Sequence, residues 1–552
     1  MRKTRILFCS EATFLNTGYA TYTREILKYL YSTGKYEIAE LAAYGMDKDP
    51  RSKAPWKFFG VMPDPSNQEL TNLYKSNPKS QFGGFAFERV CLEFLPDIVC
   101  DIRDFWMTDF VHNSPFRKFF KWALMPTVDA YPQAKEWINM YSAADACLSY
   151  SDWSGEVLKK QSRNKINYIG TASPSADLSY KPIENKESLR ESLGIDPNTK
   201  IIGTVMRNQR RKLYPDLFSA FRKFLYSSNN PNEYKLYCHT SYPDAGWDLP
   251  EILSEHSLHS YVLFTYVCLE TGRFFASHFH GAVTRSPFTG KFSAKLANVK
   301  NGLSYPDLAK IMNCFDLYVQ YANSEGFGLP QVEAASCGIP VMSIDYSAMS
   351  SVIKKLNGYA IPYKSLYKEM ETGCERAVPD NDAAAQMFSE FFSKPLAMRK
   401  KEGFEMRQNF LKKFQWEISG KVWESYFDSV ETLSLEKSWK SPVDIQKPER
   451  NIPEELNNAP YPDVVNWLFD KALCKPQDKY NYEYDNILNN LIYGFSTSPI
   501  IGSFFNEDDS VVSLSKKIEN QPFTIQYAHE QLVNKRNNIN LWETKRAEVF
   551  NL

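Results

Sequence analysis

Several features are missing from this chain of 552 residues, and each absence excludes a class of protein. Basic and acidic residues balance at 65 each, so a protein coated in basic residues is excluded, although a local basic cleft would not show in that sum. No stretch approaches the ~20 apolar residues that a membrane-spanning helix needs. The apolar run at residues 6–9 is too short for a signal peptide and fits a first buried strand.

Metal-binding patterns are also sparse. The ten cysteines contain no C-x-x-C pair, so we expect reduced, mostly buried thiols of a cytoplasmic protein. Residues 268–272 resemble a zinc-ribbon knuckle that has lost its second cysteine, and residues 286–290 resemble the partner knuckle with both cysteines lost. The single thiol that remains, that of Cys268, cannot hold zinc. Residues 268–300 are therefore predicted to form a small β insertion that folds without metal. Asp382 is interpreted as a helix N-cap rather than as part of a metal-binding D-x-D motif.

What the chain does contain is typical of a globular protein. Hydrophobic residues make up 43% of it, and 33 Tyr and 37 Phe suffice for large cores or for surfaces that stack on sugars or bases. The length exceeds one ordinary core and predicts two domains with an appendage.

The order of the patterns predicts an α/β architecture. Residues 6–30 read as strand, glycine turn and helix, which is the start of a Rossmann-like half, and a second half opens with a buried strand at 200–206. Residues 45–80 show little periodicity and are expected to be a long loop or insertion. The predicted divisions are 1–182, 183–435 and 436–552. Prolines mark a linker at the start of the last division, which is predicted to be mostly helical.

One stretch, residues 323–341, organises the second half. It follows a run of strand formers at 315–321, and two glycines in it suit a backbone that approaches a ligand closely. The loop then runs into a helix whose first turn holds a proline and which stops at a glycine. Free amides and the helix dipole make such a loop an anion site, and two carboxylates, Glu325 and Glu333, flank it. The plain alternative is any strand-helix unit of a parallel sheet, with Glu333 as a solvated helix residue.

The exact letters favour the first interpretation. EGFGLP at 325–330, the spacing of the two glutamates and CGIPV at 337–341 closely resemble the signature of retaining GT-B glycosyltransferases of family 4, of a phage or bacterial type with a C-terminal extension. The resemblance spans roughly residues 5–433. It implies an α/β GT-B fold, with two Rossmann-like domains facing across a cleft. It also implies transfer with retention of configuration, with no metal and no cofactor besides the nucleotide-sugar co-substrate.

The resemblance also implies roles on the donor side. Glu325 would bind hydroxyls of the transferred sugar, and Glu333 would bind the nucleotide ribose. Arg207 and Lys212, which follow the strand at 200–206, would hold the diphosphate, whose developing charge fixed cations stabilise.

Further donor contacts come from backbone positions. The amides implied to hold phosphate or sugar are those of Gly326, Phe327, Gly328 and Leu329. Gly18 matches a glycine beside the donor phosphates or the acceptor, although Thr17 replaces the usual second glycine; the alternative is a helix-entry glycine without a chemical role. Residues 345–348, at the end of the next strand, are expected to line the sugar pocket.

The acceptor side departs from the family pattern. Asp129 stands near the place where the family often has histidine, so it is a candidate to orient an acceptor hydroxyl or take its proton; a structural aspartate that caps a turn is the alternative. Arg103, Asp104 and Trp106 follow another predicted strand and could offer a cation and a stacking face to an acceptor. A salt-bridged loop is the alternative there.

The expected activity is transfer of a hexose or pentose from a nucleotide-diphosphate sugar to a hydroxyl. A glycan or small molecule is the default acceptor. One alternative is a phage-type DNA glycosyltransferase acting on hydroxymethylated bases in the host cytoplasm, with the basic residues near 534–538 touching the acceptor. Another is a non-catalytic protein that binds nucleotide sugars on the same fold.

Overall fold

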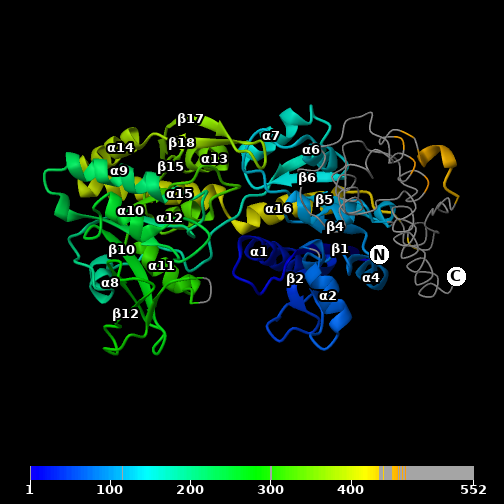
Figure 1. The fold of residues 1–552 in the computed structure, drawn as a ribbon, viewed down its shortest axis with the longest axis horizontal. Helices are drawn as coiled ribbons and strands as arrows, with labels where there is room; N and C mark the ends of the chain where they lie inside the picture. The colour runs from blue at the N-terminus through cyan, green and yellow to red at the C-terminus, as the bar shows by residue number, and fades with distance from the viewer. Residues whose placement is uncertain are drawn as a thin grey trace. The chain divides into compact units, whose positions relative to one another are not determined.

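The computed structural model describes residues 2–433 except 77, 115, 299 and 300, and beyond them residues 439, 451–457, 459, 463, 467 and 471. The chain divides into two compact units (Figure 1). One consists of Met1–Pro126, Lys135–Cys147 and Val430–Leu552, and the other of Thr127–Ala134 and Leu148–Ser429. The predicted boundary near residue 182 stays a prediction. Among the described residues, no helix combines the length and the apolar character needed to cross a bilayer.

The first sheet has seven strands in the order β3-β2-β1-β4-β5-β6-β7, and the pairs from β3 through β6 are parallel. The strands are β1 (Thr4–Glu11), β2 (Tyr36–Met46), β3 (Lys57–Met62), β4 (Ile98–Asp101), β5 (Lys121–Leu124), β6 (Ala146–Ser149) and β7 (Tyr168–Thr171). The strand order reverses beside β1, as in doubly wound nucleotide-binding folds.

Helices connect these strands. They are α1 (Gly18–Ser32), α2 (Gln68–Ser76), α3 (Pro78–Gln81), α4 (Phe87–Phe94), α5 (Asp109–His112), α6 (Lys135–Ser142) and α7 (Asp152–Gln161). Residues 45–80 were expected to be a long loop or insertion, and the long loop is wrong, because they contain β3 and the helices α2 and α3. These elements are short, so their apolar side chains do not repeat often enough to show a clear period.

The second sheet has nine strands, with a path in the order β12-β13-β10-β9-β8-β14-β15-β16 and β11 paired to β10. The strands are β8 (Lys200–Val205), β9 (Tyr234–His239), β10 (Val262–Cys268), β11 (Phe274–Ser277), β12 (Val283–Thr284), β13 (Ala294–Leu296), β14 (Leu317–Gln320), β15 (Val341–Ile344) and β16 (Tyr359–Ile361). The central strands are parallel, whereas β11, β12 and β13 form antiparallel pairs. The predicted β insertion after Cys268 is therefore confirmed.

The helices that follow α7 in the chain are α8 (Lys186–Ser192), α9 (Tyr214–Ser227), α10 (Leu249–Glu255), α11 (Tyr305–Asn313), α12 (Leu329–Ser336), α13 (Ser347–Leu356), α14 (Asn381–Ser393), α15 (Leu396–Lys413) and α16 (Trp416–Ser429). A separate hairpin pairs β17 (Tyr363–Lys368) with β18 (Glu375–Pro379). The N-cap of α14 is Asp380, not Asp382 as predicted, because the Asp380 side chain accepts from the amides of Asp382 and Ala383. An N-cap side chain accepts from the amides two and three residues ahead. Both Asp380 and Asp382 stand near the start of the helical run, so the sequence alone does not decide which of them is the cap.

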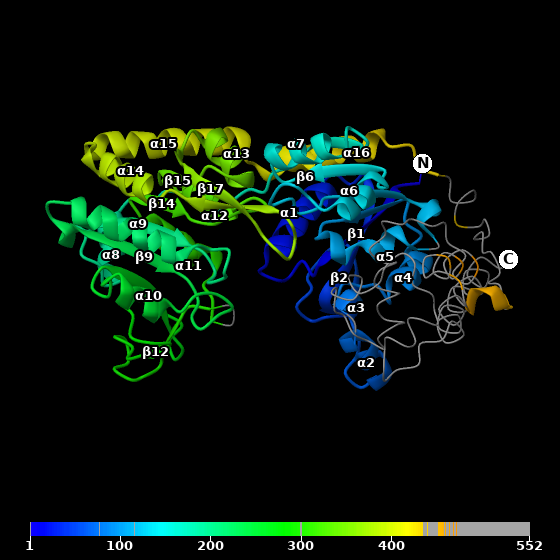
Figure 2. The same ribbon diagram turned by 45° about the horizontal axis from the view of Figure 1, so that its top comes forward.

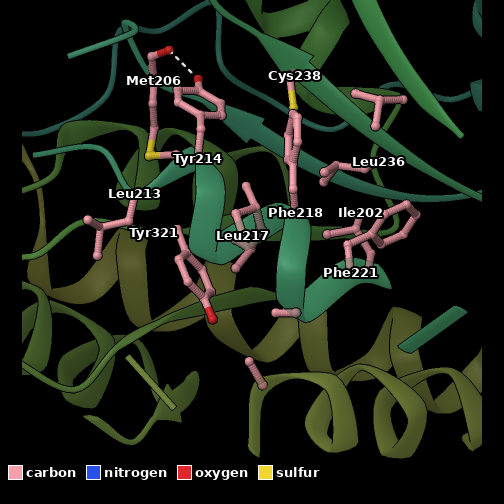
Figure 3. Packing of buried hydrophobic residues seen from close by; sticks show 14 of the residues in the cluster. Ile202, Met206, Leu213, Tyr214, Leu217, Phe218, Phe221, Leu236, Cys238 and Tyr321 are labelled. Atoms are coloured by element: carbon pink, nitrogen blue, oxygen red, sulfur yellow. Dashed lines mark hydrogen bonds between the residues drawn. The ribbon is translucent and has the colours of Figure 1, made fainter. Parts of the chain in front are cut away.

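The core of the second unit fixes the loop 206–213. Helix α9 packs on β8 and β9 through residues such as Phe218, Phe221 and Ile202 (Figure 3). The buried Tyr214 hydroxyl donates to the carbonyl oxygen of Met206 at 2.6 Å, drawn as a dashed line in Figure 3. Both ends of the loop 206–213 are thereby held against this core.

The chain beyond α16 is described at few positions. Trp439 is fully buried in the first unit, where its indole packs against Phe116 and Phe119 and donates to the Pro96 carbonyl at 3.1 Å. This contact anchors the start of the predicted extension. The prediction that 436–552 is mostly helical falls largely outside the described residues.

Candidate active site

The candidate site is built from two loops that follow neighbouring strands. Strands β8 and β14 pair in parallel, so the loops at their carboxyl ends, 206–213 and 321–328, emerge at the same edge of the sheet. Backbone hydrogen bonds join the loops: the amide of Leu213 donates to Tyr321 O at 3.2 Å, and that of Asn323 donates to Arg211 O at 3.0 Å. This pairing places cationic side chains of the first loop beside a carboxylate of the second.

The centre of the site is the Glu325 carboxylate, which is only 5% exposed. The Lys212 ammonium contacts its Oε1, and Arg211 Nη1 lies 2.5 Å from its Oε2. Gln320, fully buried on β14, donates from Nε2 to Oε1 at 3.0 Å. A buried carboxylate is stable only when charges and donors compensate it, and here two cations and an amide do so. The sequence pointed to Glu325 and Lys212 as site residues, but it did not indicate that Arg211 and Gln320 contact the Glu325 carboxylate.

The backbone around Glu325 is held from the next strand-helix connection. Ser347 Oγ accepts from the Glu325 amide at 3.0 Å and donates to the Glu325 carbonyl at 3.2 Å. Ser347 adopts a φ of 54°, which is uncommon for a residue with a side chain and is often retained at functional sites. Residues 345–348 were expected to line the sugar pocket; the structure shows Ser347 fixing Glu325.

The glycine loop leads into α12 as the sequence predicts. Gly328 has a φ of 85°, which favours glycine, and Pro330 lies in the first turn of the helix. A Cβ on Gly326 would lie 2.6 Å from Thr127 Cγ2, so a side chain there would displace its neighbour. Within the described part of the chain, the amides of Gly326, Phe327 and Gly328 make no hydrogen bond. Free amides at a helix N-terminus are suited to bind an anion.

Glu333, in α12, is 6% exposed, so its interpretation as a solvated helix residue is wrong. Burial raises the pKa of its carboxyl group from 4.5 to about 8, an effect opposed by the nearby Tyr180 hydroxyl and assisted by the charge of Asp177. A carboxyl group that shifts this far is typical of functional sites.

Arg207 has a different partner from Lys212. Its guanidinium forms two hydrogen bonds with the Asp244 carboxylate, at 2.8 and 2.9 Å, and its side chain is half exposed. This pairing lowers the pKa of Asp244 to about 2. The structure therefore brings Lys212, but not Arg207, onto Glu325, and the diphosphate role of Arg207 stays a prediction.

Asp129 belongs to the same compact unit as Glu325 and lies beside the loop that carries it. Its Oδ2 is 2.8 Å from Arg376 Nη1 and accepts from Ser324 Oγ at 3.4 Å. Arg376, on β18, also pairs with Glu369 at 2.7 Å. Sequence reasoning missed Arg376 and Ser324, whose contacts with Asp129 join positions about 200 residues or more apart. The proposed base role of Asp129 stays a prediction.

The first unit holds the other predicted residues. Arg103 is fully buried in an ion pair with Asp101, whose other oxygen accepts from Trp122 Nε1 at 2.7 Å. This arrangement is the salt-bridged alternative, so Arg103 offers no cation to an acceptor in this structure. Asp104 accepts from the Tyr19 hydroxyl at 2.7 Å. Trp106 is partly buried, edge-on to Phe82. Gly18 starts α1 after the N-cap Thr17.

No group of three or more His, Cys, Asp or Glu side chains that could hold a metal occurs among the described residues. In the β insertion, hydroxyls surround the remaining knuckle cysteine. Hydrogen bonds from Ser286, Thr271 and Ser293 lower the pKa of the Cys268 thiol to about 6.

Comparison with known structures decides the fold. A sucrose-phosphate synthase from Thermosynechococcus elongatus superposes with a TM-score of 0.57 at 15% identity, over 78% of this chain and all of that one. Anabaena HepE in complex with UDP and glucose gives 0.53 at 13% identity, over 77% of this chain and all of that one. The fold is GT-B. The predicted fold class is thereby confirmed for the described residues.

Sequence comparison finds similarity to glycosyltransferases in part of this chain. Residues 295–390, which contain Glu325 and Glu333, match the model described as "Glycosyl transferases group 1". A chitobiosyldiphosphodolichol β-mannosyltransferase from Candida albicans is 36% identical over 87 residues, which is 15% of this chain and 18% of that protein. The GtfA subunit of a peptide N-acetylglucosaminyltransferase from Streptococcus agalactiae is 27% identical over 117 residues, or 20% and 21% of the two chains. The matches thus span about a fifth of these relatives.

Gln320→Leu is expected to lower the free energy of unfolding by about 1–3 kcal/mol, because Glu325 Oε1 loses a buried donor and the Tyr318 hydroxyl, which donates to Gln320 Oε1, loses its acceptor. Urea unfolding measures the change. Gln386→Leu, in α14, is the control, because the Gln386 amide makes an exposed bond with Glu390. Equal effects of the two variants would contradict a special role for Gln320.

Glu333→Gln is expected to change the pH dependence of stability. The folded protein keeps the Glu333 proton up to about pH 8, whereas the unfolded chain releases it near 4.5, so the stability contributed by wild-type Glu333 falls as pH rises through that window. The always neutral glutamine should gain on wild type by about 1.4 kcal/mol per pH unit. Urea unfolding at pH 5 and pH 8 checks this; a difference between the two proteins that is the same at both pH values would refute it.

Proposed function

We propose that the protein is a retaining glycosyltransferase that moves a hexose or pentose from a nucleotide-diphosphate sugar to a hydroxyl acceptor. The observation that carries the proposal is the buried Glu325 carboxylate held by Lys212 and Arg211 at the entrance to α12. Glu325 and α12 lie within the segment that matches the group 1 glycosyl transferase model, and Arg211 and Lys212 reach Glu325 from outside that segment. It combines cations for a diphosphate with a carboxylate that accepts from sugar hydroxyls.

The donor site works by exchange of partners. A nucleoside diphosphate carries more negative charge than the Glu325 carboxylate, so it competes for Lys212 and Arg211. Once the diphosphate binds these cations, Glu325 is released to accept hydrogen bonds from the sugar. The free amides of the loop 326–328 supply further donors to phosphate or sugar oxygens.

During transfer the bond between the sugar carbon and the diphosphate oxygen breaks, and a bond from that carbon to the acceptor oxygen forms on the same face. Negative charge grows on the leaving diphosphate, where Lys212 and Arg211 stabilise it. Asp129, beside Ser324, is placed to orient the acceptor hydroxyl or to take its proton. Because protein cations neutralise the leaving group, we propose that turnover needs no metal.

Glu333 is proposed to bind the donor ribose, as the resemblance implies. In the structure it is buried in α12 close to Tyr180, and burial raises the pKa of its carboxyl group to about 8, so the group keeps its proton at neutral pH. A protonated carboxyl group both donates and accepts, which suits a pair of ribose hydroxyls. UDP-glucose is the first donor to test, since the similar HepE was solved with UDP and glucose. A glycan or small molecule is the default acceptor, and a cytoplasmic location stays a prediction.

A donor-hydrolysis assay tests the proposal. Purified wild-type protein with UDP-glucose and other nucleotide sugars should release nucleoside diphosphate, with and without EDTA, and Glu325→Gln should release it at least ~100-fold more slowly. Glu405→Gln, an exposed change of the same kind on α15, should match wild type. If wild type and Glu325→Gln release nucleoside diphosphate equally slowly with every donor, the protein is not an enzyme of this class. The configuration of the released sugar, followed by NMR, separates retention from inversion.

A further inference from the structure

The β insertion forms a basic lobe, defined here as residues 268–298, on a chain with no net charge. The lobe contains the basic residues Arg273, Arg285, Lys291 and Lys295 and one acidic residue, Glu270, so its net charge is +3. It includes β11, β12 and β13, and β12 lies on the side of its unit away from α14 and α15 (Figures 1 and 2). All four cationic side chains are exposed.

Strand register places one cation of the lobe, Lys295, between apolar residues of the neighbouring strands. Lys295 pairs with Val267 on β10 and with Val283 on β12, so these three residues lie side by side across the strands. Leu269 and Arg285 come directly after β10 and β12, one residue beyond the end of each strand. Leu269 and Val283 are 46% and 44% exposed, which leaves a mixed cationic and apolar surface open to solvent.

The cations of the lobe are weakly compensated. Within the described part of the chain, Arg273, Arg285 and Lys295 form no ion pair. Lys291 lies 3.4 Å from Glu270, but the lysine side chain is 71% exposed, so water screens the pair. Beside them Phe292 is 72% exposed, with the Arg285 guanidinium 5.5 Å from its ring centre. Unpaired cations next to an exposed aromatic ring suit phosphates with a neighbouring base that stacks.

The lobe holds these groups on two tight turns that backbone hydrogen bonds close. The Leu269 amide donates to Ser293 O at 2.8 Å, and the Ser286 amide donates to Lys291 O at 2.7 Å. Thr289 and Ser293 hydroxyls lie 3.1 Å apart near Cys268, where the knuckle-like turns meet. The cations are therefore preorganised, so binding costs less ordering entropy than it would on a free loop.

The lobe also leaves the sheet at the edge formed by the carboxyl ends of its parallel strands. Strands β8, β9 and β10 are parallel, and the lobe leaves β10 at its carboxyl end, the edge from which the loop 206–213 leaves β8. From these observations we infer that the basic lobe binds nucleic acid, with Arg285, Lys291 and Lys295 on phosphates and Phe292 against a base. This binding goes beyond the proposed sugar transfer and is measured without it.

A membrane surface is the main competing partner. Insertion into a bilayer needs a broad apolar area, whereas Phe292 alone among the lobe's apolar residues is more than half exposed. The charge and the single ring favour nucleic acid.

Fluorescence anisotropy with a labelled 25-nucleotide DNA, single-stranded and duplex, tests the inference on the full-length protein at several salt concentrations. The variant R285Q/K291Q/K295Q should bind at least ~10-fold more weakly than wild type, and the slope of log affinity against log salt should fall by up to about 3. The matched control is K400Q/K401Q/K412Q on α15, which removes the same charge from exposed positions and should bind like wild type.

Phe292→Ala gives a second, charge-neutral test. It should weaken binding to single-stranded DNA more than to duplex, because only unpaired bases stack on the ring. Three results would overturn the inference: no salt-dependent binding by wild type, equal loss in the lobe and control variants, or tighter binding to vesicles of anionic lipid than to DNA. Donor hydrolysis by the lobe variant should equal that of wild type, so failure of this inference and failure of the proposed transferase activity are distinguishable.

Discussion

The second unit depends at its functional edge on a buried ion pair, that of the Glu325 carboxylate with Lys212 and Arg211. A carboxylate that is only 5% exposed is stable only when opposite charges or donors contact it. The parallel pairing of β8 with β14 supplies the two cations, because it brings the loops that carry them and Glu325 together. Ser347 and Gln320 then fix the backbone and the carboxylate of the same residue. The two cations that we propose for the donor diphosphate are thus ordered by an internal anion.

That arrangement has a consequence for donor binding. The internal carboxylate lowers the cost of burying the cations before the donor arrives, but it also competes with the donor for them. Affinity for the nucleotide is therefore a difference between two ion pairs rather than the full strength of one. In the proposed mechanism this exchange would couple the two ends of the donor, because Glu325 would accept from the sugar only once the diphosphate had taken over Lys212 and Arg211.

Local patterns predicted much of this site, and long-range contacts account for what was missed. The strand-loop-helix unit at 323–341 was predictable because its glycines, proline and stop signal act within a few residues of one another. The choice of Lys212 over Arg207 as the partner of Glu325 was not, since it depends on where Asp244 lies. The ion pair of Asp129 with Arg376 spans 247 residues, and the burial of Arg103 depends on Asp101 and Trp122. Such contacts leave no local period or motif in the sequence.

The most direct test of the central claim is calorimetric binding of UDP to wild type and to Glu325→Gln. If the carboxylate and the diphosphate compete for Lys212 and Arg211, the neutral variant should bind UDP about tenfold more tightly, a gain of ~1.4 kcal/mol, while its affinity for uncharged uridine stays unchanged. Weaker UDP binding by the variant would contradict the account, because it would show that Glu325 holds the cations in place for the diphosphate instead of competing with it.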